Sequence, residues 1–400
     1  SVSDNLQLEK VAKLIKNTTK VVIKAGGGSC NFAEKVKQLA EKCKIPVVLS
    51  PGSTGVLPDQ HPMNMHVGGS KGSISGNYVM GNAELLVLIG SRAVCQSDCS
   101  GIGYEKVADV INLNCDLNDA VHYNRTVLLP GDIGATLDKL FQILKKFPSE
   151  LNEEKKSWLK NCADSKREWY KFKQERYDCP PIWDEKWNRD VLTQPSSIKV
   201  VADFAKNINA VKYFDAGDVQ ANGFQIVEDD SPSETFTESG ASYMGFAPSA
   251  LAASALAEQP KYGICFCGDG SFMMNPQILI DAVELGVKGM IVIFDNRRMG
   301  AISGLQEAQY GEGFKTSDSV EIDYVRMAGS VKGVKAFYGG ERISELKSAI
   351  KKAYTHQGIS IIHVPVYYGN NPLGGMGAYG SWNVGNWCKS VQEKYHSQNL

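Results

Sequence analysis

Gly268-Asp269-Gly270-Ser271 is the stretch that decides the fold of this chain, and it is followed 25 positions after Gly270 by Asp295-Asn296. A short apolar run, 262–267 (YGICFC), leads into the glycines, and a second, 290–294 (MIVIF), leads into Asp295. Short apolar runs that end in such residues are typical of strands buried on both faces. We therefore expect two strands with polar residues at their carboxyl ends.

A helix is expected between these two strands. Asn275 suits the N-cap, Pro276 suits the first helical position, and Gly286 suits the end. Four apolar residues recur between them with helical spacing: Ile278, Leu279, Ala282 and Val283. A strand-helix-strand unit of this kind puts Asp269 and Asn296 at the carboxyl ends of parallel strands, the edge at which open α/β sheets bind ligands.

The residue types at this edge favour a magnesium-diphosphate site. Magnesium takes hard oxygen ligands and commonly combines a few protein ligands with phosphates. Asp269 offers a carboxylate, Asn296 offers an amide oxygen, and the carbonyl of Arg298 would be a third ligand. The two glycines let the backbone approach a phosphate, and Ser271 adds a hydroxyl donor. The alternative interpretation is a simple turn after a strand, since short motifs also match by chance.

The wider segment 268–302 (GDGSFMM…IVIFDNRRMGAI) resembles thiamin-diphosphate (ThDP) enzymes of the acetolactate synthase type. Their signature is GDG, a spacer of this length and a paired Asn. Asp295 replaces the first Asn here, whereas Asn296 keeps the position that the family uses on the metal. The metal ligands implied by the resemblance are therefore Asp269, Asn296 and the Arg298 carbonyl.

Two further segments resemble cofactor-binding parts of this family. Residues 242–248 (SYMGFAP) match the segment that lines the aminopyrimidine, and Met244 matches the apolar residue that bends the cofactor. Residues 217–220 (GDVQ) match the loop over the diphosphate. The cofactor-binding residues implied are Gly217, Asp218, Val219, Gln220, Ser242, Tyr243, Met244, Gly268, Gly270, Ser271, Asn296, Arg298, Met299, Gly300, Ala301 and Ile302.

Within the superfamily, 294–314 and Gly217-Asp218 look like the branch of the trihydroxycyclohexanedione hydrolases. Acetolactate synthases usually carry Gln-His where this chain has Asp218-Val219. A carboxylate beside a diphosphate is repulsive unless a metal intervenes or the side chain turns away. Asp218 therefore departs from the better-known pattern and leaves the role of that loop open.

The length and composition are typical of a globular chain with two domains. The 400 residues, 43% of them hydrophobic, suit two α/β domains, and a net charge of −1 gives no electrostatic case for nucleic acid or an anionic membrane. No apolar run approaches a membrane span of about 20 residues, and we expect a cytoplasmic protein. The ten cysteines lie mostly in expected strands and helices, and Cys95-x3-Cys99 lacks further zinc-type ligands.

Alternating strands and helices predict an α/β fold of two doubly wound parallel-sheet domains. We expect a middle, Rossmann-like domain over 1–146, a helical connection rich in tryptophan over 147–195, and a ThDP diphosphate- and magnesium-binding domain over 196–400. The glycine-rich tail after 369 has no clear periodicity, and a tail that covers the active site is one interpretation.

Flavin binding is a separate question for the middle domain, because acetolactate synthases bind FAD there. The glycines 26–28 match a dinucleotide fingerprint only in part. Met65-His66 is present, but Val67 intervenes before the glycine at which the family motif ends. Arg92 also matches a family arginine. Since members without flavin share these features, FAD stays possible and the balance of the motifs is against it.

The family's pyrimidine-binding domain, which supplies the glutamate that activates the cofactor, has no counterpart in this sequence. The resemblance therefore implies one subunit of a split enzyme, with a pyrimidine-domain subunit on a separate chain and two copies of each in a heterotetramer. A truncated or degenerate homologue is the alternative.

Three functions remain open at this stage. The first is a ThDP- and magnesium-dependent subunit that cleaves or forms C–C bonds next to a carbonyl, most like a cyclic 1,2-diketone hydrolase. The second is an acetolactate-synthase-like carboligase or decarboxylase of 2-oxo acids, and the third is a non-catalytic scaffold. Arg297 and Arg298 would meet an anionic substrate or lie on the surface, and no histidine is assigned a catalytic role.

Overall fold

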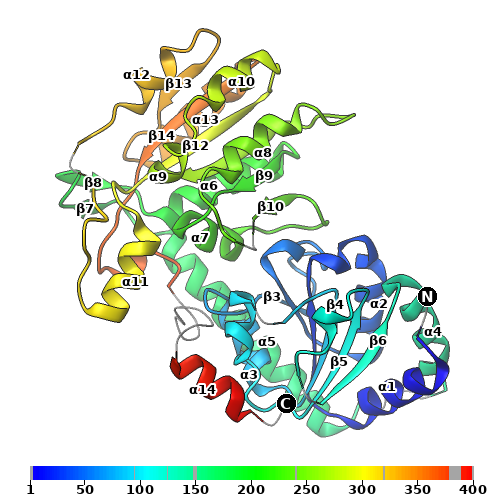
Figure 1. Cartoon of the computed structure of the whole chain (residues 1–400). Helices are drawn as coiled ribbons and strands as arrows, with labels where there is room; N and C mark the ends of the chain where they lie inside the picture. The colour runs from blue at the N-terminus through cyan, green and yellow to red at the C-terminus, as the bar shows by residue number, and fades with distance from the viewer. Residues whose placement is uncertain are drawn as a thin grey trace. The chain divides into compact units, whose positions relative to one another are not determined.

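The computed structural model describes residues 3–93, 95–123, 125–146, 151–238, 241–318, 320–377 and 389–398. They form two compact units (Figure 1). The first unit takes the described residues of 1–171, 228–233 and 378–400, and the second takes those of 172–227 and 234–377. Within the described residues, no helix combines the length and the hydropathy that a membrane crossing requires.

The first unit is built on a six-stranded parallel sheet in the order β3-β2-β1-β4-β5-β6. Its strands are β1 (Val21–Ala25), β2 (Val47–Leu49), β3 (Asn64–Val67), β4 (Leu85–Ile89), β5 (Asp109–Asn114) and β6 (Thr126–Pro130). Its helices are α1 (Asn5–Asn17), α2 (Ala33–Cys43), α3 (Ile74–Asn82), α4 (Ile133–Leu144), most of α5 (Glu153–Tyr177) and α14 (Lys389–Ser397). Every residue of β1 and β4 is buried, as strands covered on both faces require.

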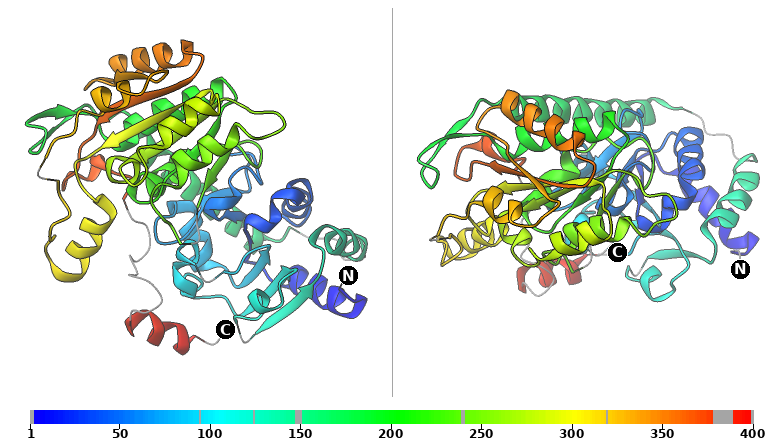
Figure 2. Two further views of the ribbon diagram at one scale, coloured as in Figure 1. Left: turned by 45° about the horizontal axis from the view of Figure 1, so that its top comes forward. Right: turned by 90° about the horizontal axis from the view of Figure 1, so that it is seen from above.

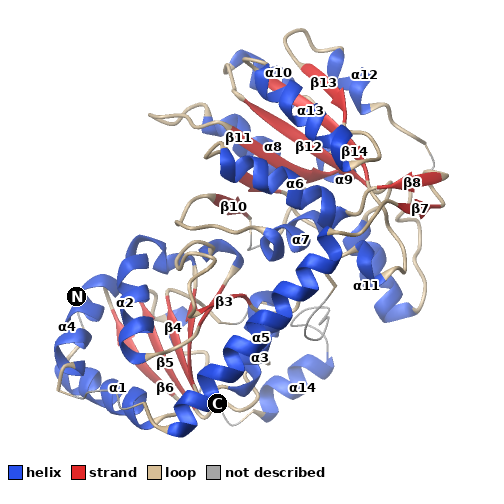
Figure 3. Ribbon diagram, turned by 180° about the vertical axis from the view of Figure 1, so that it is seen from behind, coloured by secondary structure: helices blue, strands red, loops and turns tan. Residues whose placement is uncertain are grey.

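The second unit repeats this design with the order β10-β9-β11-β12-β14-β13, again with every pair parallel. Its strands are β9 (Val211–Phe214), β10 (Thr235–Thr237), β11 (Gly263–Gly268), β12 (Gly289–Asp295), β13 (Lys335–Tyr338) and β14 (Ile359–Pro365). Its helices are α6 (Gln194–Asn207), α7 (Asp218–Ile226), α8 (Phe246–Ser254), α9 (Asp269–Phe272), α10 (Ile278–Glu284), α11 (Gly300–Tyr310), α12 (Tyr324–Gly329) and α13 (Ile343–Thr355). Helices cover both faces of this sheet (Figures 2 and 3). Both sheets confirm the predicted α/β class.

Short 3-10 helices also occur in the described residues. They are η1 (Gly27–Phe32), η2 (Pro51–Ser53), η3 (Gln96–Gly101), η4 (Asn118–Ala120) and η5 (Pro372–Gly374).

The segment expected to be a helical connection is helical only in part. α5 occupies its first half, but β7 (Ile182–Asp184) and β8 (Arg189–Val191) then form an antiparallel hairpin. Trp187 lies in the turn of this hairpin, and its Nε1 donates to the carbonyl of Asp295 at 3.2 Å. Of the tryptophans in this segment, Trp158 and Trp169 lie in α5 as expected, whereas Trp183 and Trp187 belong to the hairpin.

The helix between β11 and β12 also begins later than its cap residues predict. α9 forms a single turn directly after β11, and α10 starts only at Ile278. Asn275 and Pro276 lie in the turn between the two, where their carbonyls accept from the backbone N–H groups of Ile278 and Leu279. Because β11 ends at Gly268 and α9 begins at Asp269, the carboxylate of Asp269 lies directly at the strand end.

Candidate functional site

Three neighbouring strands of the second unit end in the residues that the sequence selected. β9 leads to Gly217-Asp218, β11 to Gly268-Asp269 and β12 to Asp295-Asn296, and β11 lies between the other two. The chain leaves β9 toward β10 and returns to β11 on its other side, so the strand order reverses between β9 and β11. Open α/β sheets bind ligands at such a switch point, and the predicted residues gather there.

Asp218 is the first residue of α7 and is held by two amide donors. Its Oδ2 accepts from Gln194 Nε2 at 2.6 Å and from Asn296 Nδ2 at 2.9 Å. Gly217 caps the helix with φ +102, a conformation that favours glycine. The side chain therefore turns toward the end of β12, and its contact with Asn296 joins two predicted site segments that are 78 positions apart.

A line of amides continues from Asp218 toward the residues after β14. Gln194 Oε1 accepts from Asn222 Nδ2 at 2.6 Å, and Asn222 Oδ1 accepts from the backbone N–H of Met376 at 3.2 Å. Met376 is fully buried. Residues 378–388 lie outside the described residues, so the idea that the tail covers the active site stays a prediction.

Asp269 begins α9 and is 9% exposed. Burial first, and then the charges of Asp295 and Asp218, raise the pKa of this carboxyl to about 8. Ser271 Oγ, two residues on, donates to the carbonyl of Ala216 at 3.3 Å. A buried carboxyl beside two other acids is a site that favours a cation, because a cation offsets both the desolvation and the repulsion.

The turn after β12 is fixed by Asp295. One of its oxygens accepts from the backbone N–H of Arg297 at 2.9 Å, and the other lies 2.8 Å from His363 Nε2. Arg297 has φ +57, and Asn296 Oδ1 accepts from the backbone N–H of Arg298 at 3.0 Å. Asp295 therefore shapes the backbone that carries Asn296, whereas Asn296 is buried between Asp218 and Arg298.

His363, on β14, is a site-supporting residue that the sequence did not single out. It is 6% exposed and packs among the rings of Trp187, Tyr324 and Tyr338. Its pairing with Asp295 explains why a histidine occupies a strand in which every residue is buried. The signal in the sequence was this polar residue within the run IIHVP.

Asp215, directly after β9, is a second residue that sequence reasoning missed. Its carboxylate accepts from the backbone N–H groups of Gly245 at 2.9 Å, Ala247 at 2.8 Å and Ala216 at 2.8 Å. Burial raises the pKa of Asp215, and these backbone donors oppose the rise. Asp215 thereby anchors the start of α8, which follows Met244.

Two methionines converge above the glycine of the GDG motif. A Cβ added to Gly270 would lie 3.2 Å from Met244 Cε and 3.2 Å from Met299 Sδ. Gly268 has a looser surrounding, with Val219 Cγ2 3.9 Å from its added Cβ. The absence of a side chain at Gly270 therefore leaves room that both methionine tips border.

The segment before Met244 is tied to α7 by Gln220. Gln220 Nε2 donates to Thr237 Oγ1 at 2.5 Å and to the carbonyl of Glu238, and its Oε1 accepts from Ser242 Oγ at 3.0 Å. Tyr243 next to it is 56% exposed. Further along, Gly300, Ala301 and Ile302 form the first turn of α11.

No cluster of three or more His, Cys, Asp or Glu suited to a metal ion occurs in the described part of the chain. The predicted ligand set of one carboxylate, one amide and one carbonyl is not of that kind. It suits magnesium that is shared with a diphosphate. The ligand roles of Asp269, Asn296 and Arg298 stay predictions.

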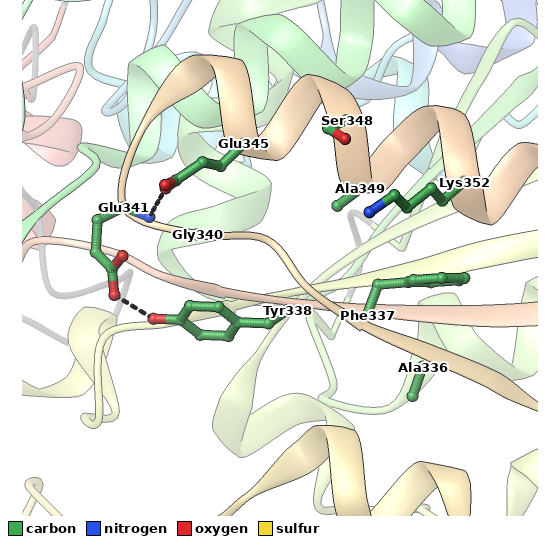
Figure 4. Close-up of a pocket in the computed structure, with 9 residues that line it drawn as sticks. All are labelled: Ala336, Phe337, Tyr338, Gly340, Glu341, Glu345, Ser348, Ala349 and Lys352. Atoms are coloured by element: carbon green, nitrogen blue, oxygen red, sulfur yellow. Dashed lines mark hydrogen bonds between the residues drawn. The ribbon is translucent and has the colours of Figure 1, made fainter.

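A pocket of about 470 Å³ lies elsewhere, between β13 and α13 (Figure 4). Glu341 at its rim accepts from Tyr338 Oη at 2.5 Å, and its backbone N–H donates to Glu345 at 2.9 Å. None of the predicted site residues lines it. The strand ends are therefore the better candidate site.

In the first unit, Gly26 and Gly28 pack against the loop after β4. A Cβ on Gly26 would lie 2.3 Å from the carbonyl oxygen of Gly90, and one on Gly90 would lie 2.5 Å from the carbonyl carbon of Gly28. His66 has φ +63 and pairs with Asp59 at 3.3 Å. Close approach of two backbones accounts for these glycines without a bound phosphate.

Comparison with known proteins gives two matching family models. Residues 8–140 match the central domain of thiamine pyrophosphate enzymes, and residues 215–364 match their C-terminal TPP binding domain.

The individual proteins that this chain resembles have two different activities. The chain is 26% identical to acetolactate synthase isozyme 1 large subunit of Escherichia coli K12, over 90% of this chain and 60% of the relative. It is 28% identical to the probable acetolactate synthase large subunit of Methanococcus aeolicus, over 87% of this chain and 58% of the relative. It is 26% identical to 3D-(3,5/4)-trihydroxycyclohexane-1,2-dione hydrolase of Bacillus subtilis, over 98% of this chain and 64% of the relative.

The chain thus spans 58–64% of the length of these relatives. The two family models fall on the two sheets, and the second includes the candidate site residues that follow β9, β11 and β12. The sequence, the two sheets and the matches together place this chain in the superfamily of thiamin-diphosphate enzymes.

Proposed function

We propose that the chain is the cofactor-binding subunit of a split enzyme that cleaves or forms C–C bonds next to a carbonyl with ThDP and magnesium. The observation that carries this proposal is the gathering of Asp218, Asp269 and Asn296 at three adjacent strand ends of the unit that matches the C-terminal TPP binding domain.

The residues at these strand ends fit a magnesium-diphosphate group. The buried Asp269 carboxyl, whose pKa is raised by burial and by the charges of Asp295 and Asp218, supports a cation at this position. Asp269, Asn296 and the carbonyl of Arg298 would hold magnesium, and the backbone at 268–271 and 217–220 would face the diphosphate. When bound, ThDP supplies a nucleophilic carbon and an electron sink for bonds next to a carbonyl.

This chain's own contribution is to bind, orient and exclude water. Gln194 and Asn296 hold the Asp218 carboxylate, which limits its repulsion of a diphosphate. Asp215 fixes the start of α8, so that Met244 stands at a defined position over Gly270. An unbranched apolar side chain there would shape the cofactor without competing for its polar atoms.

Met244→Ala should therefore lower turnover of the assembled enzyme more than its ThDP affinity. Normal turnover together with a lower melting temperature would instead assign Met244 to the core. Asp269→Ala should abolish metal-dependent ThDP binding in calorimetry, and binding equal to that of the parent would refute the anchor.

We propose a cyclic 1,2-diketone as the first substrate class, because the trihydroxycyclohexanedione hydrolase is matched over nearly the whole chain. The second candidate is carboligation or decarboxylation of 2-oxo acids, which the similar acetolactate synthases favour. Turnover of butane-2,3-dione against pyruvate by the assembled enzyme distinguishes the two.

A partner subunit is part of the proposal. Four apolar side chains at the candidate site are exposed by 37–56%: Tyr243, Met274, Met299 and Ile302. Exposed apolar groups that rim a polar site mark an interaction surface. We propose that a pyrimidine-domain subunit covers them in a cytoplasmic heterotetramer with two copies of each chain, since C₂ symmetry is the commonest arrangement.

The test is to assay the purified chain alone with ThDP, magnesium and both substrates, and then with a pyrimidine-domain protein added. Turnover should require the addition. Robust turnover by this chain alone would refute the split-enzyme proposal.

A further inference from the structure

Two consecutive arginines follow Asn296, and the structure gives them different surroundings. Arg297 is fully engaged: its Nε donates to Asp318 at 3.1 Å, and its Nη1 lies 3.6 Å from a Glu321 oxygen. Its Nη1 also donates to the carbonyl of Lys186 at 3.2 Å. This arginine belongs to the internal framework around the hairpin.

Arg298 has no ion pair and no side-chain hydrogen bond to any of the described residues, and its Nε is buried without a partner. A buried polar donor that is left unpaired loses the free energy of its hydration. Natural structures retain such a group mainly where a ligand or water pairs with it. The unpaired Nε of Arg298 therefore points to a missing acceptor.

The guanidinium is nevertheless held in place. Its central carbon lies 4.8 Å from the centroid of the Tyr368 ring, and Tyr368 Oη donates to the carbonyl of Gly300 at 3.3 Å. The backbone of Arg298 bridges to Ser317, and Met299 N donates to the carbonyl of Thr316 at 2.8 Å. Stacking on an aromatic ring leaves the planar fork of an arginine free to bind a carboxylate or phosphate with two bonds.

This side chain lies beside the candidate site. Gly300 carries the carbonyl that Tyr368 binds, and a Cβ added to it would lie 2.7 Å from Asp218 Oδ2 and 2.9 Å from Asn296 Nδ2. Asp218 and Glu307 are the two acids near enough for their charges to raise the pKa of Tyr368. Asp218 is already paired with Gln194 and Asn296, and Glu307 is exposed on α11, so neither occupies the guanidinium.

We infer that Arg298, stacked on Tyr368, binds an oxyanion at the edge of the cofactor site. Two sources share this chemistry: the carboxylate of a 2-oxo acid substrate and a phosphate of the cofactor. The inference rests on the proposed function for the identity of the site. A carboxylate at Arg298 would select acidic substrates over neutral diketones, and so would favour the second substrate class, the 2-oxo acids, over the first.

The experiment compares the parent with Arg298→Gln and Arg298→Lys. The matched control is Arg326→Gln, which removes the same charge from the exposed face of α12 and touches none of these groups. Calorimetry on the assembled enzyme measures ThDP with magnesium first, and then pyruvate and butane-2,3-dione in the presence of both. Inorganic phosphate is titrated separately into the chain without cofactor.

Arg298→Gln should weaken pyruvate binding by about 10- to 100-fold, the usual worth of a hydrogen bond to a charged group, and leave butane-2,3-dione unchanged. Arg298→Lys should retain part of the pyruvate affinity that Arg298→Gln loses. Loss of ThDP affinity with unchanged pyruvate binding would assign the oxyanion to the cofactor's phosphate. Unchanged binding of pyruvate, ThDP and phosphate in Arg298→Gln would overturn the inference.

Failure of the proposed function gives a different result. A parent protein that does not bind ThDP with magnesium refutes that function. Phosphate binding that depends on Arg298 but not on Arg326 would still support the oxyanion site.

Discussion

Gly300→Ala should weaken cofactor binding although it adds a single methyl group to the first turn of a helix. The added Cβ would lie 2.7 Å from Asp218 Oδ2 and 2.9 Å from Asn296 Nδ2, whereas ordinary contact begins near 3.4 Å. The carboxylate would have to retreat by about 0.7 Å. It cannot do so freely, because Gln194 and Asn296 both hold that same oxygen.

The magnitude follows from the bond that breaks. A hydrogen bond to a charged group contributes about 1.5–3 kcal/mol, which corresponds to about 10- to 100-fold in affinity. We expect ThDP with magnesium to bind more weakly by that factor, because Asn296 loses the contact that orients its amide. The free energy of unfolding without cofactor should fall by a similar amount.

The control lies one turn along the same helix. A Cβ on Gly304 meets no atom within 4 Å, so Gly304→Ala adds the same group in open space. It should raise the free energy of unfolding by up to about 1 kcal/mol, the helix-propensity gain, without any change in cofactor affinity. Both variants are measured by urea unfolding and by calorimetric titration of ThDP with magnesium. If Gly300→Ala matches Gly304→Ala in both, the Asp218–Asn296 contact does not organise the site.

Three further outcomes are expected. The pKa of Asp269, about 8 in the folded chain, lies above an unfolded value of about 4, so its proton stabilises the fold at low pH. Without metal, the free energy of unfolding should therefore fall as the pH rises from about 4 to about 8. A fall of equal size in Asp269→Asn would show that Asp269 does not cause it. Lys24→Met should destabilise the chain by about 3–5 kcal/mol in urea, since it leaves the buried Asp98 carboxylate, 3.6 Å away, without its cation; Lys24→Met with Asp98→Asn should recover part of the loss. The purified protein should show no flavin absorbance, because backbone packing explains Gly26 and Gly28, and FAD released on heating would contradict this.

The sequence predicted those parts of the fold that local patterns determine. The apolar runs before Gly268 and Asp295 form β11 and β12, and the glycine and acid types mark where they end. The edge strands β10 and β13 were not predicted, because they are three and four residues long and carry exposed residues. Short edge strands leave little periodicity to detect.

The residues that support the site depend on contacts between distant positions. His363 meets Asp295 across 68 positions, and Asp215 meets Gly245 across 30. No local pattern encodes such pairs. The sequence alone also gives no reason to prefer Arg298 to Arg297 as the residue that binds an anion. The chemistry of the strand ends was therefore predictable, whereas the residues that fix its geometry were not.

The amide line from Met376 to Asp218 has a consequence for its own polarity. Asn and Gln side chains can be turned either way, but a backbone N–H at one end can only donate and a carboxylate at the other can only accept. Each amide between them must therefore present oxygen toward Met376 and nitrogen toward Asp218. The backbone N–H and the carboxylate thus impose the same direction on every dipole in the line, one from each end. An amide at position 218 would leave the N–H of Met376 as the single fixed end, and the orientation of Asn222 and Gln194 would then depend on that one donor.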